Sequence, residues 1–248
     1  MKISIITAVY NRSNTVGQAI RSVSGQQYPD IEHLIIDGAS TDGTLEEVEA
    51  CQTPLMRVIS ERDTGIYNAL NKGVGLATGD IVGLMHSDDF YPNPFVLKKV
   101  SAAFEDELVD AVYGDLDYVS YAKPEVVLRR WRSGEFEFSK LMRGWMPPHP
   151  TLFLRRSIIT KYGGYNEDFR IASDYEAILR YFGSDGFRAI YIPEVLMKMR
   201  VGGESNRSLG HIVRKTREDY LALRSTGIGG LRALAWKNLS KLPQFVTR

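Results

Sequence analysis

Two adjacent carboxylates, Asp88 and Asp89, follow an apolar run that is typical of a buried strand over residues 80–85. Ionised carboxylates are rarely placed at the end of a core strand unless a cation meets them. A divalent metal that carries a diphosphate is such a partner, because hard cations prefer oxygen ligands. The pair therefore indicates a site for Mn²⁺ or Mg²⁺, although a solvated turn at a strand end would place the same residues there.

Polar side chains also follow the other strands that the first half of the chain predicts. Short apolar runs over residues 3–9, 33–36 and 56–59 alternate with helical patterns over residues 15–24, 44–50 and 65–77. This alternation favours an α/β fold with a mostly parallel sheet covered by helices, and ligands of such sheets collect at the carboxyl ends of the strands. The residues expected there are Tyr10, Asn11, Asp37, Glu61, Arg62, Asp63, Asp88 and Asp89.

The second half of the chain is less regular. Residues 125–138 are expected to form an edge or mobile segment, and Thr44 and Ser173 are expected to be the N-caps of their helices. The remaining expected elements are strands over 111–117, 151–154 and 187–192 and helices over 157–162, 174–182, 211–223 and 230–242.

Length and composition limit the class of protein. A chain of 248 residues suits one large α/β domain with or without a small appendage, and 44% hydrophobic and 25% charged residues are ordinary for a soluble globular protein. The single Cys51 excludes an internal disulfide and a multi-cysteine zinc site. A signal peptide and an apolar run of membrane-spanning length are not expected, so the sequence predicts a cytoplasmic protein.

Charge is distributed unevenly along the chain. The net charge of +1 implies no general affinity for nucleic acid, but the last 51 residues carry eleven Lys or Arg and only three Asp or Glu. This basic tail is a candidate for contact with a membrane or with lipid phosphate. Its last predicted helix is expected to place Leu231, Leu234, Ala235, Leu239 and Leu242 on one arc, with Lys237 and Lys241 opposite. That arc either docks on the catalytic core or lies on the inner face of the plasma membrane.

Taken in order, several motifs resemble those of a family 2 glycosyltransferase with the GT-A fold, a Rossmann-like arrangement with a C-terminal helical extension. The resemblance covers roughly residues 1–205. It is carried by the strand and loop 7–12, the turn 37–44, the block 61–73 that continues to Asp80, the metal motif 87–89, and the acceptor-side residues 163–165 and 172–176. The family often has an Asp at the position of His86, so either Asp88 or Asp89 is the direct metal ligand, and the imidazole of His86 is a candidate ligand as well.

The resemblance divides the chain into a catalytic domain, 1–205, and a basic helical extension, 206–248. Within the catalytic domain it implies a nucleotide-sugar-binding half, 1–115, and an acceptor-side half, 116–205. The implied donor-side residues are Thr7, Tyr10, Asn11, Asp37, Arg62, Asp63 and Asp88, with Asp89 and Asp88 at the metal.

The implied reaction is the transfer of a sugar from a nucleotide-diphosphate sugar, by default a UDP-sugar, to a saccharide or lipid-linked acceptor, with inversion. Inversion needs one general base, which takes the acceptor proton during attack. The resemblance assigns that role to Asp174, with Glu176 as the fallback, and it places His149 and Arg200 near the acceptor or the diphosphate. Assembly of bacterial cell-surface polysaccharide is the implied context.

Two other classes of protein remain as alternatives. A nucleotidyltransferase on a related sheet would want a glycine-rich basic loop after the first strand, which residues 10–14 do not provide. A non-catalytic sugar- or nucleotide-binding protein would leave the polar strand ends unexplained. A dinucleotide oxidoreductase is excluded because no G-x-G-x-x-G follows Val9.

Overall fold

The computed structural model describes residues 1–201 and 209–239. Its strands are β1 (Ile3–Val9), β2 (Ile31–Asp37), β3 (Met56–Ser60), β4 (Ile81–Leu84), β5 (Ala111–Ser120), β6 (Val127–Trp131), β7 (Phe153–Arg155) and β8 (Ala189–Val201). Its helices are α1 (Val16–Ser24), α2 (Thr44–Ala50), α3 (Ile66–Leu76), α4 (Val96–Ala103), α5 (Phe138–Leu141), α6 (Arg156–Tyr162), α7 (Ser173–Phe182), α8 (Leu209–Ser225) and α9 (Leu231–Leu239), with a 3-10 turn, η1, at His149–Thr151.

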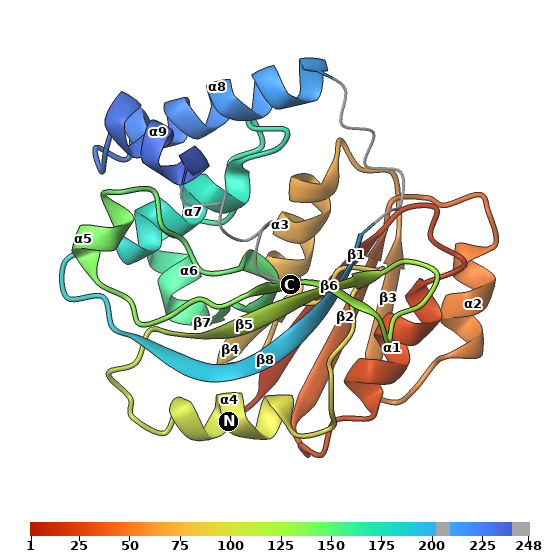
Figure 1. Ribbon diagram of the computed structural model, residues 1–248. Helices are drawn as coiled ribbons and strands as arrows, with labels where there is room; N and C mark the ends of the chain where they lie inside the picture. Colours follow the sequence, from red (N-terminus) through yellow and green to blue (C-terminus); the bar gives the residue numbers. More distant parts are fainter. Residues whose placement is uncertain (202–208, 240–248) are drawn as a thin grey trace.

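The strands form one mixed eight-stranded sheet in the order β3-β2-β1-β4-β7-β5-β6, with β8 paired to β5 outside that path (Figure 1). β1 to β4 are parallel, as the sequence predicts for the first half. β7 then pairs antiparallel with both β4 and β5, and β6 pairs antiparallel with β5 at the sheet edge. Residues 127–131 are thus an edge strand, one of the two expectations for that segment.

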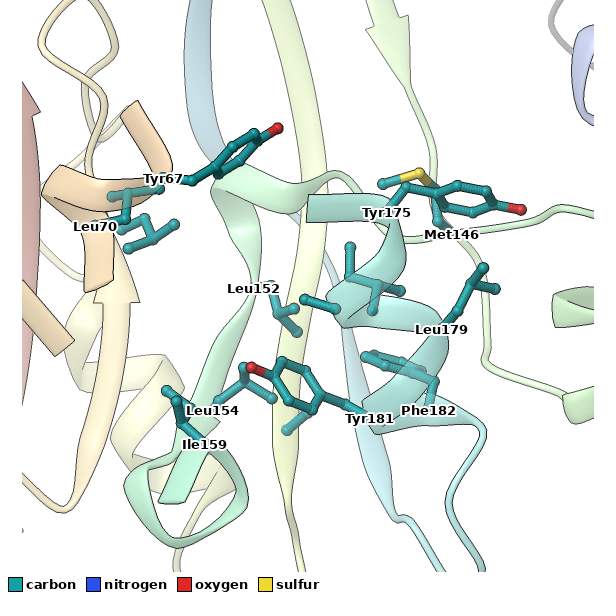
Figure 2. Packing of buried hydrophobic residues seen from close by; sticks show 14 of the residues in the cluster. Tyr67, Leu70, Met146, Leu152, Leu154, Ile159, Tyr175, Leu179, Tyr181 and Phe182 are labelled. Atoms are coloured by element: carbon teal, nitrogen blue, oxygen red, sulfur yellow. The ribbon is translucent and has the colours of Figure 1, made fainter. Parts of the chain in front are cut away.

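Alternate residues of β1 face opposite sides of the sheet. Because the side chains on both sides are mainly apolar, helices cover both faces. Ile3 and Ile5 belong to a core cluster that includes side chains of α1 and α4. Ile6 and Ala8 belong to the larger cluster, which side chains of α3, α6 and α7 complete (Figure 2). All seven residues of β1 are buried, as expected for a parallel strand that is covered on both faces.

The C-terminal helices share the core of the rest of the fold. α8 packs on α7 and α9 packs on α8, forming the outer layer beyond α7 in Figure 1. Ala222, Leu223, Ala233 and Leu234 lie in the same hydrophobic cluster as the residues of α7. The boundary expected at residue 205 lies outside the described residues.

The arc predicted for the last helix is wrong. Leu234 is buried, but Leu231 and Ala235 are exposed, and Lys237 is only 2% exposed. The Lys237 ammonium lies 2.9 Å from an Asp219 oxygen and 3.0 Å from the centre of the Tyr175 ring. An ion pair and a cation–π contact therefore stabilise a cation at a position expected to face water. Leu242 and Lys241 lie outside the described residues, as does the side chain of Leu239.

Several element boundaries also differ from expectation. Thr44 and Ser173 are the first residues of their helices, not N-caps, and Gly43 and Ala172 precede them. β8 continues nine residues beyond the predicted strand, past Pro193, because a register shift near Gly114 of β5 absorbs the irregularity. α4 and α5 were not predicted.

Two glycines allow a matched test of this packing. A Cβ on Gly83 of β4 would lie 2.5 Å from the Phe153 ring, whereas a Cβ on exposed Gly75 of α3 would meet nothing within 4 Å. We expect Gly83→Ala to lower the free energy of unfolding by about 1–3 kcal/mol through overpacking. Gly75→Ala should raise it by about 0.5–1 kcal/mol, because alanine favours the helix. Urea unfolding followed by circular dichroism measures both, and equal effects would contradict the packing described for β4.

Candidate active site

Two adjoining hollows lie at the carboxyl ends of the parallel strands. The first, the donor hollow, has a volume of about 400 Å³ and is lined by residues that follow β1, β3 and β4, among them Tyr10, Asp63 and Asp88. The second, the acceptor hollow, has a volume of about 320 Å³ and contains Asp174 at the start of α7. His86 lines both hollows and so forms a wall that they share.

Residues after β1 divide between the donor hollow and the scaffold. Tyr10 is 58% exposed and presents its ring to the hollow, where Arg12 also lies. Asn11 has the positive φ of a left-handed turn (51°), and its side-chain oxygen accepts the Thr41 N–H at 2.9 Å. The structure therefore uses the amide of Asn11 to join two loops.

Two residues expected to bind nucleotide are fully buried away from the hollow. The Asp37 carboxylate accepts hydrogen bonds from the Ser40 hydroxyl at 2.5 Å and the Ser60 hydroxyl at 2.6 Å. Thr7 shares a hydrogen bond of 2.9 Å with the ring of His33. Both residues are 0% exposed. In this conformation Asp37 stabilises the loop after β2 and Thr7 stabilises β1, and neither residue lines the donor hollow.

The loop after β3 places one of its two predicted residues at the donor hollow. Asp63 lines it, and one of its carboxylate oxygens accepts the Gly65 N–H at 2.9 Å, just before α3 begins. Arg62 is exposed outside the lining, and its carbonyl accepts a hydrogen bond from Lys72 at 3.0 Å. A base edge in the hollow would therefore meet Asp63 before Arg62.

The two carboxylates after β4 point to different environments. Asp88 is half-buried and lines the donor hollow, whereas Asp89 is 0% exposed. Among the residues that the structure describes, neither oxygen of Asp89 has a hydrogen-bond partner. Burial and the nearby Asp88 charge hold the pKa of Asp89 well above its usual range, and the nearby Arg200 opposes that rise only in part.

Arg200 supports the carboxylate turn from behind. Its guanidinium donates to the Asp88 backbone oxygen at 2.6 Å and to the side-chain oxygen of Gln18, and it lies over the Phe90 ring. The residue is 7% exposed. In this conformation Arg200 positions the turn and does not reach the hollow where a diphosphate would lie. Residues 202–208, which follow it, lie outside the described residues.

The side chains at the donor hollow fit a metal ion that is bound partly by the protein and partly by a phosphate ligand. Within residues 1–201 and 209–239 no group of three or more His, Cys, Asp or Glu side chains could hold an ion alone. Mg²⁺ in nucleotide-using enzymes is commonly held by one or two carboxylates together with the phosphates of the substrate. Asp88 supplies such a carboxylate, and the imidazole of His86 lines the same hollow.

Asp174 is the carboxylate of the acceptor hollow. It is half-buried at the first turn of α7, and the Tyr67 hydroxyl lies 3.5 Å from one of its oxygens. Glu176, the fallback base, is 7% exposed and bonds Arg180 through both oxygens, at 2.9 and 3.0 Å. Since that ion pair occupies Glu176, Asp174 is the one of these two carboxylates that is available to a molecule in the hollow.

His149 also lines the acceptor hollow, as the resemblance implies. Its Nε2 shares a hydrogen bond of 2.9 Å with the Tyr165 hydroxyl, and its ring centre lies 5.9 Å from that of His86. Burial lowers the pKa of both imidazoles, that of His149 to about 4, while the charge of Asp174 opposes the change in each. Two uncharged rings therefore separate Asp174 from the donor side.

Sequence reasoning missed most of the acceptor hollow. Its other walls come from distant segments: Leu116, Tyr118, Trp131, Met146, Met199, Lys215, Asp219 and Lys237. These are mainly apolar or aromatic residues of β5, β6, β8 and the C-terminal helices. Their spacing in the chain carries no common pattern, so no sequence signal could have found them.

The chain belongs to the glycosyl transferase family 2, whose family model matches residues 4–164. It is 33% identical over 183 residues to an uncharacterised glycosyltransferase of Mycobacterium tuberculosis, covering 72% of this chain and 68% of that one. It is 32% identical over 212 residues to a PGL/p-HBAD biosynthesis glycosyltransferase of Mycobacterium bovis, covering 82% and 78%. The protein is thus a glycosyltransferase.

Solved structures of glycosyltransferases share the fold. A mannosyltransferase from Pyrobaculum calidifontis, in complex with GDP-Man and Mn²⁺, superposes with a TM-score of 0.70 at 20% identity, covering 98% of this chain and 70% of that chain. S. aureus TarS 1-349 in complex with UDP-GlcNAc gives 0.71 at 18% identity, covering 92% and 66%. The GT-A fold predicted from the sequence is confirmed.

The buried imidazole of His149 makes stability depend on pH. Folding lowers its pKa from 6.5 to about 4, so between these values the unfolded chain binds a proton that the folded chain does not. The contribution of about 3 kcal/mol is complete above pH 6.5 and is lost as the pH falls toward 4.

We therefore expect His149→Gln to flatten the fall in unfolding free energy between pH 6.5 and 4.5, measured by urea unfolding. His33→Gln is the matched comparison, because the pKa of His33 is lowered to about 3 outside the site. The His33→Gln variant should flatten the fall in unfolding free energy over the same pH range without changing the acceptor hollow. A wild-type slope in His149→Gln would show that its ring is not held neutral.

Proposed function

We propose that the protein transfers a sugar from a nucleotide-diphosphate sugar to an acceptor hydroxyl with inversion at the anomeric carbon. One observation carries this proposal: the donor and acceptor hollows share the wall formed by His86, with Asp88 on one side and Asp174 on the other. An in-line displacement needs the leaving group and the base on opposite sides of the reacting carbon. A sugar lying against His86 would have that arrangement.

On the donor side, the exposed ring of Tyr10 is the surface on which a nucleotide base would stack, and Asp63 would accept a hydrogen bond from its edge. Asp88 faces the hollow where the diphosphate would then lie. Asp88 would hold Mn²⁺ or Mg²⁺ together with the phosphates, and the cation would neutralise the charge on the departing diphosphate. Asp89, in contrast, would remain buried behind the turn.

On the acceptor side, Asp174 would accept the proton of the attacking hydroxyl. It lies in the first turn of α7 and lines the acceptor hollow, whose other walls are mainly apolar. A bound acceptor would exclude water from these walls and place its hydroxyl beside the carboxylate. His149 would contact the acceptor and hold Tyr165 in place.

We infer that the acceptor is a saccharide or a lipid-linked saccharide, used in cell-surface polysaccharide or glycolipid assembly on the cytoplasmic side of the membrane. The mycobacterial relative named for PGL/p-HBAD biosynthesis supports this context, as do the apolar walls of the acceptor hollow. Among the described residues, no helix is long and apolar enough to cross a bilayer. Contact with a membrane would therefore be made by a surface of the protein, and the basic C-terminal helices are the candidate.

The donor assignment predicts a metal-dependent response to nucleotide. We expect UDP at a hundredfold excess over its dissociation constant to raise the melting temperature by roughly 5–10 °C with Mn²⁺ and by much less with EDTA. Asp88→Asn should remove the difference, whereas Asp185→Asn, at an exposed position outside both hollows, should retain it. If UDP, GDP and dTDP all leave the melting temperature unchanged with metal, the donor-site assignment fails.

The base assignment predicts a separation of binding from transfer. We expect Asp174→Asn to keep the Mn²⁺-dependent nucleotide shift but to lose roughly 10²–10⁴-fold in the rate of transfer, because general base catalysis is worth about that much. Release of nucleoside diphosphate, measured over a panel of nucleotide sugars and glycoside acceptors, tests the rate. Full activity in Asp174→Asn would remove this residue as the base, and Asp185→Asn again serves as the control.

A further inference from the structure

Among the described side chains of α8, the exposed charged residues are all arginines. Arg214, Arg217 and Arg224 are exposed, as are Val213 (68%) and Leu221 (44%). The only acidic residues of this helix, Glu218 and Asp219, are 8% and 2% exposed. Since both carboxylates are buried, no exposed acidic side chain of α8 balances its three exposed guanidinium groups.

Part of the outward face that these exposed residues form borders a hollow, here called the arginine hollow, with a volume of about 270 Å³ and walls formed by Asp168, Arg170, Arg214, Arg217, Glu218 and Leu221. Glu218 accepts the backbone N–H groups of Ile171 and Ala172, at 2.8 and 3.0 Å. Its charge is therefore used to hold the segment that leads into α7. Exposed Asp168 is the other acidic residue of the wall.

Within the part of the chain that the structure describes, the guanidinium groups of Arg170, Arg214 and Arg217 make no ion pair and no hydrogen bond. Arg214 and Arg217 are three residues apart on one helix, a spacing at which like charges repel. Repulsion between these unpaired guanidinium groups thus destabilises the folded chain, and a bound anion would reduce that repulsion. Guanidinium groups bind phosphate oxygens through paired hydrogen bonds.

We propose that the outward face of α8, with the arginine hollow, binds the phosphate groups of an anionic phospholipid bilayer. Charge complementarity favours a bilayer, and the exposed Val213 and Leu221 lie among the arginines, where they would enter the boundary between headgroups and acyl chains. α8 lies in the outermost layer of the molecule, on the side away from the sheet (Figure 1).

The opposite side of the same helix faces the acceptor hollow, where Lys215 and Asp219 contribute to the wall. In the segment that leads into α7, Arg170 lines the arginine hollow, while Ile171 and Ala172 line the acceptor hollow. A bilayer on the outward face would therefore bring a membrane-borne acceptor next to Asp174. This consequence for the acceptor rests on the proposed transfer reaction, whereas the binding of vesicles by α8 can be measured without it.

The test is co-sedimentation of the full chain with vesicles of phosphatidylcholine alone or mixed with phosphatidylglycerol. We expect binding only to the mixed vesicles, and this binding should weaken as salt rises from 50 to 200 mM.

Arg214→Glu with Arg217→Glu should weaken binding at least tenfold. Arg57→Glu with Lys98→Glu changes the net charge equally at exposed positions outside α8 and should leave binding unchanged. Val213→Ser with Leu221→Ser should weaken binding while retaining its salt dependence.

Three results would overturn the proposal: no binding to anionic vesicles, equal binding to both kinds of vesicle, or wild-type binding by the Arg214→Glu, Arg217→Glu variant. If inorganic phosphate raises the melting temperature of the wild type only, and vesicles do not bind, the hollow serves a soluble phosphate instead. The Mn²⁺-dependent UDP shift of the same variant should equal that of the wild type. If UDP, GDP and dTDP give no Mn²⁺-dependent shift in any form of the protein, the donor-site assignment is refuted and the vesicle result still stands.

Discussion

The donor side of this protein depends on how the end of β8 holds the turn after β4. The Arg200 guanidinium donates to the Asp88 carbonyl, and the backbones of Lys198 and Phe90 exchange hydrogen bonds of 2.9 and 3.1 Å. A charged side chain at the end of a core strand needs a rigid turn and a nearby cation, and Arg200 supplies both. Because the turn is fixed from behind, Asp88 faces the hollow and Asp89 faces the core.

That division also sets the charge that an incoming diphosphate meets. Burial favours the uncharged forms of both Asp89 and His86. Of residues 86 to 89, Asp88 is the one whose carboxylate lies at the hollow. A third carboxylate at the position of His86 would add negative charge beside the phosphates. The imidazole, whose pKa burial lowers, instead gives the two hollows a common wall without a charge.

The sequence predicts the parallel half of the fold well, because each of its strands contains a short, mainly apolar run that is followed by polar residues. It predicts less well which way those polar residues point. Asp37 and Asp63 both follow strands, yet Ser40 and Ser60 bind the first within the protein, while the second lines the hollow. Partners supplied by neighbouring loops decide this outcome, and the local pattern around each residue does not contain them.

The burial of Lys237 is missed for the same reason, because its partners do not lie near it in the sequence. Its place on a helix with polar neighbours predicts exposure, but Asp219 and the Tyr175 ring provide a charge and an aromatic face that make burial favourable. Both partners lie on helices that also wall the acceptor hollow. The donor side thus follows from local sequence at the strand ends, whereas the acceptor side is assembled from β5, β6, β8 and three helices. Within this family, a change of acceptor can therefore arise by substitutions in the second half of the chain that leave the strand-end residues of the first half untouched.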